Sequence, residues 1–372
     1  MKIAIVVPGG LHPSRPEQVV PSWQALFERL AQLHEIHAFV LQQLPKAQSY
    51  SLLGFTVHDL GRPSAPFGFT RRAQQRTLAR ALDQCGPFDL IHGFHADPAG
   101  QLAARAGRRL SIPSIVTCDS GEFVSIAKIK YGSQRTSGGR AAVADACKLA
   151  TKVHVCTTYM AALAALEHIA TTVIPLTSVT SEAAMIKWSL TRHESDSFRI
   201  VQVARLSYPK NQRLLIDALP IVRERIDARL DLVGEDTLNG ELQSHAHKIG
   251  VGAHVTFHGV LPRSRVLEVL ASADLYVQSS LHEPSGVSVL EAAAAGVPVL
   301  GTRAGYVADW SPMKAMALGD AIPESLADAI LTLHADPDRR RSMAALARTF
   351  SLAQDATWSA AQFDSLYKSL KS

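Results

Sequence analysis

Short runs of β-branched residues alternate with longer helical segments along the whole of this 372-residue chain. The alternation is typical of parallel sheets covered by helices on both faces, because parallel strands need a crossover connection between them. The pattern breaks in a polar stretch at residues 179–197 and then starts again. A chain of 372 residues is also too long for one ordinary core. The sequence therefore predicts two α/β domains with a cleft between them.

Hydrophobic periodicity gives the expected elements of each domain. Apolar side chains at helical spacing in residues 20–33 lie between two strand patterns, which makes a β-α-β unit. The predicted strands are 2–7, 34–41, 90–93, 114–117 and 152–156, followed by 198–204, 229–233, 254–259, 275–278 and 298–302. The predicted helices are 20–33, 212–226, 241–249, 263–271, 286–295 and 355–370.

Composition argues for a cytoplasmic protein with reduced thiols. The four cysteines form no Cys-x-x-Cys pair, which favours structural thiols over a metal or redox motif. Five apolar residues after Lys2 are too few for a secretory signal, and no stretch of about 18 apolar residues could span a bilayer.

Residues 61–160 carry an uneven charge, with 14 Lys or Arg against 6 Asp or Glu. Such an excess suits an anionic lipid surface, a phosphorylated acceptor or nucleic acid, and it also suits an ordinary solvated face. Because no zinc-finger spacing or aromatic RNA-binding motif accompanies the charge, we expect no nucleic-acid partner.

The segment 281–302 is the most informative part of the sequence. It follows a predicted strand, crosses a loop with Pro284 and Gly286, and enters a helix. A loop that leads into a helix N-terminus at the carboxyl edge of a parallel sheet presents amide groups and a positive dipole to an anion. Glu283 and Glu291 flank this turn, and carboxylates accept hydrogen bonds from sugar hydroxyls. Nearby in sequence order, Arg205 and Lys210 can neutralise a diphosphate.

In order and approximate spacing, these residues resemble the retaining glycosyltransferases of family 4, also called glycosyl transferases group 1. The resemblance extends through Gly234, Phe257-His258-Gly259 and Ala273-Asp274 and covers residues 198–310 most strongly. It implies the GT-B fold, two Rossmann-like domains facing a cleft. It also implies a nucleoside diphosphate sugar donor, a UDP- or GDP-sugar, no obligatory metal or other cofactor, and retention of configuration at the anomeric carbon.

The resemblance divides the chain into an acceptor domain at 1–178, a linker at 179–197 and a donor domain at 198–350. Residues 351–372 are then a C-terminal helix that packs back toward the first domain. In the donor domain, Glu291 corresponds to the partner of the ribose hydroxyls, Glu283 to the partner of the donor sugar, and Arg205 with Lys210 to the diphosphate clamp. Further donor contacts are expected at Gly9, Gly10, Gly234, Val260, Ser285, Gly286, Val287 and Ser288.

The N-terminal half supplies weaker candidates for catalysis and for the acceptor. His95 is the expected cleft histidine, with His92 in reserve. Asp119 stands where many relatives carry histidine, and with Glu122 it offers carboxylates to an acceptor hydroxyl. Alternatively, Asp119 caps a helix. The expected acceptor is a carbohydrate, a lipid-linked sugar or another hydroxyl compound in polysaccharide or glycolipid assembly, with peripheral contact to an anionic inner membrane face.

Some positions depart from the family pattern. Ser285 precedes Gly286 where a bulky residue is usual, Asn211 follows Lys210 where glycine is usual, and Ser178 replaces a glycine near the end of the first domain. A sugar-nucleotide epimerase and a phosphorylase on the same fold stay open as alternatives. The departures at Asp119 and Ser178 leave a third alternative open, a nucleotide-sugar-binding protein without turnover. Asp336-Pro337-Asp338 matches an Asp-x-Asp metal motif, but we interpret it as a helix start.

Overall fold

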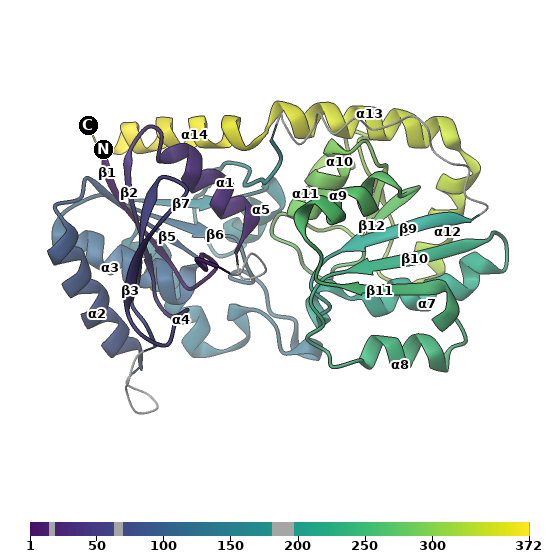
Figure 1. The fold of residues 1–372 in the computed structure, drawn as a ribbon, viewed down its shortest axis with the longest axis horizontal. Coiled ribbons are helices and arrows are strands. Elements are labelled where there is room, and N and C mark those ends of the chain that lie inside the picture. Colours follow the sequence, from purple (N-terminus) through teal and green to yellow (C-terminus); the bar gives the residue numbers. More distant parts are fainter. Residues whose placement is uncertain (15–18, 63–69, 181–196, 372) are drawn as a thin grey trace. The chain divides into compact units, whose positions relative to one another are not determined.

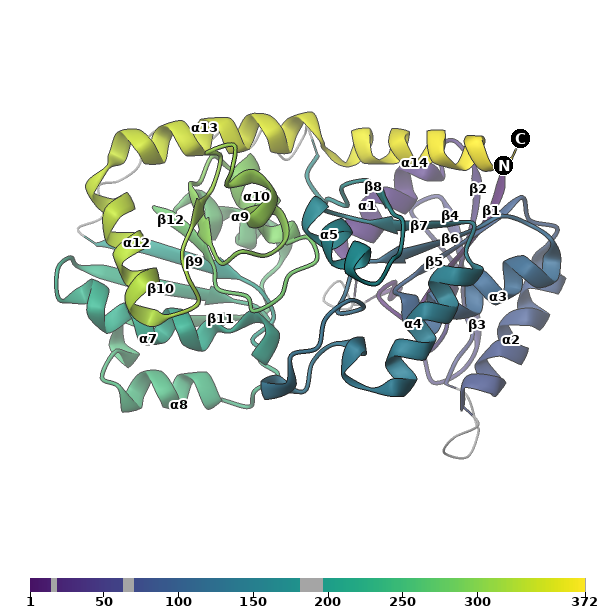
Figure 2. The same ribbon diagram turned by 180° about the vertical axis from the view of Figure 1, so that it is seen from behind.

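The computed structural model describes residues 1–14, 19–62, 70–180 and 197–371. The chain forms two compact units, one of Met1–Ser178 with Ala356–Ser372 and one of Val179–Asp355. Figures 1 and 2 show the elements of each unit from opposite sides. Most of the expected linker, residues 181–196, lies outside the described residues. The expected domain boundary after residue 350 differs from the structure, because one helix continues to Ala353 before the chain enters the first unit.

The first unit is built on an eight-stranded sheet in the order β3-β4-β2-β1-β5-β6-β7-β8. All neighbours pair in parallel except β3 and β4, which form an antiparallel hairpin at one edge. The strands are β1 (Lys2–Val7), β2 (Glu35–Val40), β3 (Gln48–Leu52), β4 (Phe55–Asp59), β5 (Leu90–Phe94), β6 (Ser114–Cys118), β7 (Lys152–Val155) and β8 (Thr172–Val173).

Alternation along β1 divides the first core between the two faces of the sheet. Ile3 and Ile5 pack in one cluster with α1 (Pro21–Leu30) and α14 (Ala356–Leu370), whereas Ala4 and Val6 pack with α2 (Thr70–Cys85) and α3 (Gln101–Leu110). A period of two sends successive side chains to opposite faces, so a strand covered on both sides is apolar throughout. Further helices, α4 (Ser137–Leu149) and α5 (Thr158–Leu166), pack on β6 and β7.

The second unit contains a six-stranded, fully parallel sheet in the order β11-β10-β9-β12-β13-β14. Leu230 and Leu232 face a core formed with α7 and α12, and Val233 faces a second core formed with α9, α10, α11 and α13. The strands are β9 (Phe198–Val203), β10 (Ala228–Val233), β11 (Val255–Gly259), β12 (Leu275–Gln278), β13 (Val299–Gly301) and β14 (Ala317–Leu318). The helices are α7 (Gln212–Arg223), α8 (Glu241–Lys248), α9 (Arg263–Ala271), α10 (Val287–Ala294), α11 (Gly305–Trp310), α12 (Pro323–Ala335) and α13 (Pro337–Ala353).

The structure confirms the predicted α/β class and the repeat of parallel sheets. Asp336 caps α13 by accepting a hydrogen bond from the Arg339 amide at 2.9 Å, which confirms the interpretation of this segment as a helix start. The sequence analysis missed the hairpin of β3 and β4 and the short strands β8 and β14.

Both sheets reverse their strand order next to their first strand. In the first unit the chain goes to one side of β1 and later returns to its other side with β5; in the second unit the same happens at β9 and β12. In open α/β sheets, ligands bind outside the carboxyl ends of the strands at such a point. The loops after β9 and β12, and those after β1 and β5, are therefore the first places to look for a site.

Candidate active site

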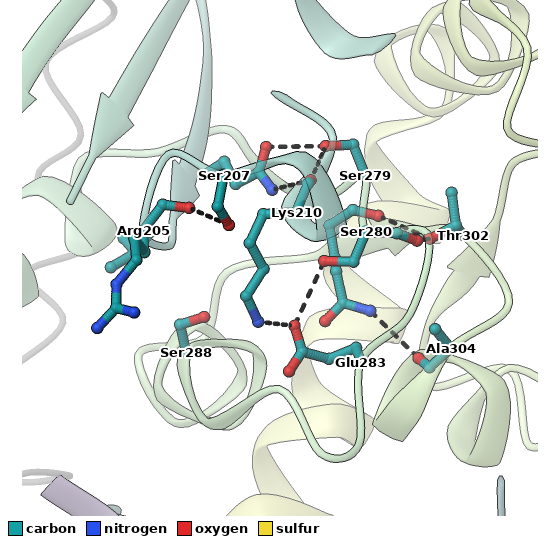
Figure 3. A network of polar contacts seen from close by, with 12 residues as sticks. Arg205, Ser207, Lys210, Ser279, Ser280, Glu283, Ser288, Thr302 and Ala304 are labelled. Carbon is teal, nitrogen blue, oxygen red and sulfur yellow. Dashed lines mark hydrogen bonds and ion pairs between the residues drawn. The ribbon is translucent and has the colours of Figure 1, made fainter. Parts of the chain in front are cut away.

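Lys210 and Glu283 form an ion pair between the loops that follow β9 and β12 (Figure 3). The Glu283 side chain is 10% exposed and that of Lys210 is 27% exposed, so the pair is shielded but open to solvent on one side. Ser280 Oγ donates a second hydrogen bond to Glu283 Oε2 at 3.3 Å. The backbone joins the same loops, because the Leu281 amide donates to the Pro209 carbonyl at 2.8 Å. The structure thus brings together two side chains that the sequence analysis assigned to the same candidate site.

Buried polar groups hold the two loops in place. Ser279 Oγ lies 3.0 Å from both Gln202 Oε1 and the Lys210 carbonyl oxygen. Thr302 Oγ1 donates to the Ser280 carbonyl at 2.5 Å. Hydrogen-bonded polar groups inside a protein are strongly oriented, because leaving one unpaired is costly. The Lys210–Glu283 pair therefore stands on a rigid support (Figure 3).

The N-terminus of α10 lies beside Glu283 in the chain and begins with a required glycine. Gly286 has φ of 92°, and a Cβ there would lie 2.7 Å from Gln278 Oε1. The Val289 amide donates to the Gly286 carbonyl at 2.9 Å, whereas the amides of Val287 and Ser288 have no partner within the helix and lie at the positive end of its dipole. The Ser285 carbonyl accepts from the Tyr306 amide at 3.0 Å, and Ser288 Oγ lies 2.7 Å from Tyr276 Oη. This turn is suited to an anionic group.

Glu291 is buried within α10 and pairs with Arg263 at the start of α9. The Arg263 guanidinium donates to Glu291 Oε1 at 2.6 Å. The Glu291 side chain is 10% exposed, whereas that of Arg263 is 43% exposed. A carboxylate oriented in this way can accept hydrogen bonds from a ligand without leaving a buried charge unpaired.

Arg205 does not join the Lys210–Glu283 pair. Its Nε lies 3.3 Å from Glu235 Oε2, both side chains are more than half exposed, and Figure 3 shows its guanidinium apart from Lys210. The neighbouring Gly234 holds the strand ends close together, since a Cβ there would lie 2.1 Å from the Ala204 carbonyl oxygen. Val260, after β11, is 54% exposed and offers an apolar surface to a ligand.

In the first unit, His95 and Asp119 lie together after β5 and β6. His95 has φ of 63°, and its Nε2 is 3.3 Å from Asp119 Oδ1. Trp23 Nε1 donates to Asp119 Oδ2 at 3.0 Å, and its ring packs against the His95 ring. Burial raises the pKa of the Asp119 carboxyl. No helix begins at Asp119, so the alternative of a helix cap is wrong, and the carboxylate instead orients an imidazole and an indole.

Glu122 and the glycine turn after β1 have structural contacts of their own. Glu122 is buried and accepts hydrogen bonds from the Ala96 amide at 3.2 Å and the Ser120 amide at 2.7 Å. Burial raises the pKa of its carboxyl. Gly10 has φ of 86°, and its carbonyl accepts from the Val20 amide, while Gly9 precedes it on the same turn.

His92 is a core residue, contrary to the expectation that it serves the acceptor. It has no exposed surface and belongs to a buried chain of hydrogen bonds with Tyr367, Thr117 and His154. His154 Nε2 donates to the Ile174 carbonyl at 2.8 Å, which sets the direction of every bond along the chain. Tyr367 Oη then donates to His92 Nδ1, and both histidines are neutral. Burial lowers the pKa of His92 and lowers that of His154 to about 4.

Several residues of these sites were missed by the sequence analysis. Ser279 and Ser280 follow β12 directly, and polar residues at a strand end were an available signal. The sequence held no signal for Trp23 or Arg263. Trp23 contacts Asp119 and Arg263 contacts Glu291 only because the fold brings segments together that are distant in sequence.

Two family models match the chain. Residues 190–350 match the model described as glycosyl transferases group 1, and residues 19–177 match the model described as the glycosyl transferase 4-like domain. The first match contains Arg205, Lys210, Glu283 and Glu291, and the second contains His95 and Asp119.

Curated relatives match shorter segments. Over 108 residues the chain is 39% identical to the putative glycosyltransferase EpsD of Bacillus subtilis, covering 29% of this chain and 28% of that protein. Over 161 residues it is 32% identical to the GDP-mannose-dependent α-(1-6)-phosphatidylinositol dimannoside mannosyltransferase of Mycobacterium tuberculosis, covering 43% of this chain and 40% of that protein. The matches span less than half the length of each of these relatives.

Solved structures match the chain over its whole length. Sucrose-phosphate synthase from Thermosynechococcus elongatus has a TM-score of 0.80 at 19% identity, covering 100% of this chain and 99% of that one. HepE from Anabaena in complex with UDP and glucose has a TM-score of 0.72 at 17% identity, covering 100% of both chains. This likeness confirms the expected fold. Within the part of the chain that the structure describes, no helix combines the length and the apolar character needed to cross a membrane.

Proposed function

Because the chain belongs to the family of glycosyl transferases group 1, we propose that it moves a sugar from a nucleoside diphosphate donor to a hydroxyl group of an acceptor. The observation that carries the proposal is the Lys210–Glu283 pair beside the N-terminus of α10. It combines a cation and free amides for a diphosphate with a carboxylate for sugar hydroxyls. Both lie at the point where the sheet reverses its strand order, which is the usual ligand site of such a sheet.

The donor occupies the second unit in this proposal. Its diphosphate contacts Lys210, Arg205 and the amides of residues 285–288, and its sugar hydroxyls contact Glu283. The ribose hydroxyls contact Glu291, which Arg263 orients, and the base lies against Val260 near Gly234. The relatives named above include a GDP-mannose-dependent enzyme, and HepE binds UDP, so a UDP- or GDP-sugar is the expected donor.

The proposed reaction retains the configuration at the anomeric carbon. The acceptor oxygen forms a bond to that carbon on the face from which the diphosphate leaves, and the carbon–oxygen bond to the phosphate breaks. The acceptor proton passes to the departing diphosphate oxygen, so the step needs no protein nucleophile. Lys210 and Arg205 stabilise the charge that develops on the leaving group.

In the first unit, we assign Asp119 and Glu122 to the acceptor, His95 to catalysis, and Gly9 and Gly10 to donor binding. His95 is partly exposed and oriented by Asp119, which suits an imidazole that hydrogen-bonds an acceptor hydroxyl. The basic excess of residues 61–160 favours an anionic or lipid-linked acceptor at the cytoplasmic face of a membrane. The mannosyltransferase from Mycobacterium tuberculosis, named for a phosphatidylinositol dimannoside, supports this assignment.

A thermal-shift screen of UDP-, GDP-, ADP- and dTDP-sugars tests the proposal and identifies the donor. A stabilising donor is then incubated with the protein, with and without a panel of lipid-linked and carbohydrate acceptors, and the products are resolved. Transfer that depends on the acceptor supports the proposal. Conversion of the donor alone indicates an epimerase, a requirement for inorganic phosphate indicates a phosphorylase, and tight binding without any product indicates a binding protein.

A further inference from the structure

His37, His58 and Cys85 bring two imidazoles and a thiol together in the first unit, apart from the loops at the carboxyl ends of the strands. His37 Nδ1 lies 2.9 Å from His58 Nε2, and His58 Nε2 lies 3.7 Å from Cys85 Sγ. The three atoms lie within 4.8 Å of one another, and all three residues are half-buried. The transfer reaction proposed above gives this cluster no task.

Strand register and one helix end create the cluster. His37 on β2 pairs with Thr56 on β4, so His58 lies two residues further along β4 and its side chain shares the face of His37. Cys85 is the last residue of α2, which packs on the same face. The side chains of Phe39 and Phe88 border the imidazoles. The cluster is thus held by two strands and a helix of one rigid core.

The remaining nitrogen of each imidazole has a polar partner. His37 Nε2 lies 2.9 Å from Glu35 Oε1, and His58 Nδ1 lies 2.9 Å from Ser49 Oγ. Metal-bound histidines in proteins almost always donate their second N–H to a carboxylate or another oxygen, which orients the ring and selects the tautomer. When His37 carries its proton on Nε2, its Nδ1 presents a lone pair, and His58 Nε2 presents one as soon as its own proton moves to Nδ1.

We propose that His37, His58 and Cys85 bind a zinc-like divalent cation. Zn–N distances of 2.0–2.1 Å and a Zn–S distance of 2.3 Å in a tetrahedral site place two nitrogens about 3.3 Å apart, and a nitrogen and a sulfur about 3.6 Å apart. The His58–Cys85 distance already meets this requirement, and the imidazoles need to separate by roughly 0.4 Å. Thiolate and imidazole ligands favour Zn²⁺ over Mg²⁺ or Ca²⁺.

Binding of the cation displaces protons from its ligands and links three elements of the first unit. Cys85 releases one proton as its thiolate forms a bond to the cation. The proton of His58 moves from Nε2 to Nδ1, and the Nδ1–H then donates a hydrogen bond to Ser49 Oγ. Water completes the coordination, since the described residues supply three ligands. The cation joins the end of α2 to the neighbouring strands β2 and β4, and it acts independently of the donor site proposed in the second unit.

Cobalt titration of the purified, tag-free chain tests the proposal. Co²⁺ replaces Zn²⁺ in such sites and absorbs strongly in the near ultraviolet when a thiolate is bound. We expect this absorption to saturate at one Co²⁺ per chain and to disappear when Zn²⁺ is added. Cys85→Ser should abolish it, and Glu35→Gln should weaken cobalt binding about 10- to 100-fold by removing the negative charge of the carboxylate that orients His37.

Cys147→Ser is the matched control, because Cys147 is also a half-buried free cysteine but lies outside the cluster. It should leave the absorption unchanged. Circular dichroism shows whether each variant is folded, and the wild-type protein should gain thermal stability with Zn²⁺ and lose that gain with EDTA. A wild-type chain without the thiolate absorption, or an absorption that persists in Cys85→Ser, would overturn the proposal and leave the two histidines as a simple hydrogen-bonded pair.

Discussion

The Lys210 ammonium contacts the Glu283 carboxylate across the loops that follow β9 and β12, which are neighbours in the sheet, although the two residues are 73 positions apart in sequence. In the proposed reaction each member has its own ligand, the diphosphate for Lys210 and the sugar for Glu283. Their contact keeps the ammonium shielded and aimed before the donor arrives. This preorganisation is the basis of the first prediction.

Lys210→Ala should lower kcat about 10²- to 10³-fold, the range found when one preorganised donor to a developing anion is removed. Steady-state kinetics with the donor identified in the thermal-shift screen give the value. Lys248→Ala is the control, because Lys248 is an exposed lysine on α8 and should leave the rate unchanged. A Lys210→Ala enzyme within twofold of the wild-type rate would exclude Lys210 from the reaction.

Arg205→Ala should lower turnover more than donor affinity. Arg205 is more than half exposed and pairs with Glu235, so its contact with a leaving diphosphate must form during the reaction. We expect a loss in kcat of about tenfold, with KM for the donor nearly unchanged, as for an interaction made mainly in the transition state. Glu235→Gln removes only the partner and should retain activity. Equal effects of the two substitutions would show that turnover depends on the Arg205–Glu235 ion pair and not on a contact between Arg205 and the diphosphate.

Glu291→Gln should weaken binding of the free nucleotide about 10- to 100-fold, because a hydrogen bond to a charged group contributes about 1.5–3 kcal/mol. Isothermal titration calorimetry measures this directly, without a sugar or an acceptor. Glu268→Gln on α9 is a suitable control, since Glu268 is exposed and pairs with Arg265. Unchanged affinity in Glu291→Gln would show that the ribose lies elsewhere.

Gly234→Ala should destabilise the second unit more than Gly250→Ala does. Both glycines have positive φ, 145° and 81°, but only at Gly234 would a Cβ meet another atom. We expect a loss of about 1 kcal/mol at Gly250 from backbone strain, and a further loss of about 1–3 kcal/mol at Gly234 from the contact with Ala204. Urea unfolding followed by circular dichroism compares the two variants. Equal losses would contradict the close approach of β9 and β10.

The buried histidines should make the first unit acid-sensitive. The pKa of His154 is lowered by burial to about 4 from 6.5, so between these values the unfolded chain binds more protons than the folded one. The contribution of His154 to the free energy of unfolding is therefore complete above pH 6.5. It decreases as the pH drops toward 4, by about 3 kcal/mol in total.

Urea unfolding between pH 7 and pH 4.5 measures this slope. His154→Gln should reduce it, whereas His245→Gln in the second unit, where the imidazole pairs with Asp217, should not reduce it in the same way. A slope that is unchanged in His154→Gln would mean that His154 does not titrate in this range.

The proximity of Lys210 and Glu283 was predictable because both residues follow strands that the sequence makes obvious. β9 and β12 are apolar runs, and the polar residues after them must meet at one edge of a parallel sheet. The sequence could not pair Arg205 with Glu235 or Glu291 with Arg263, because those contacts depend on side-chain directions between neighbouring elements. The sequence also could not show which of the two histidines, His92 or His95, is buried in the core. They are three residues apart, but His92 lies within β5 and points into the core, whereas His95 follows the strand with a positive φ.

The missed hairpin has a different cause. β3 and β4 lie at the edge of the sheet, and β3 has no buried residue, so its hydrophobic pattern is weak. Pairing with β4, rather than burial, makes it a strand. The same pairing puts Ser49 opposite His58, so the region that was hardest to predict supports the proposed metal site.

The return of the chain to the first unit determines the order in which that unit can be completed during synthesis. Phe363 and Tyr367 of α14 fill the core beside Phe27 and Ile3, yet they are translated after the entire second unit. Until then, the nascent sheet exposes this apolar face and leaves His92 Nδ1 without the tyrosine that donates to it. The unit that leaves the ribosome first is therefore completed only after the second, and a chain that stops before α14 should be recognised by chaperones and proteases as unfinished.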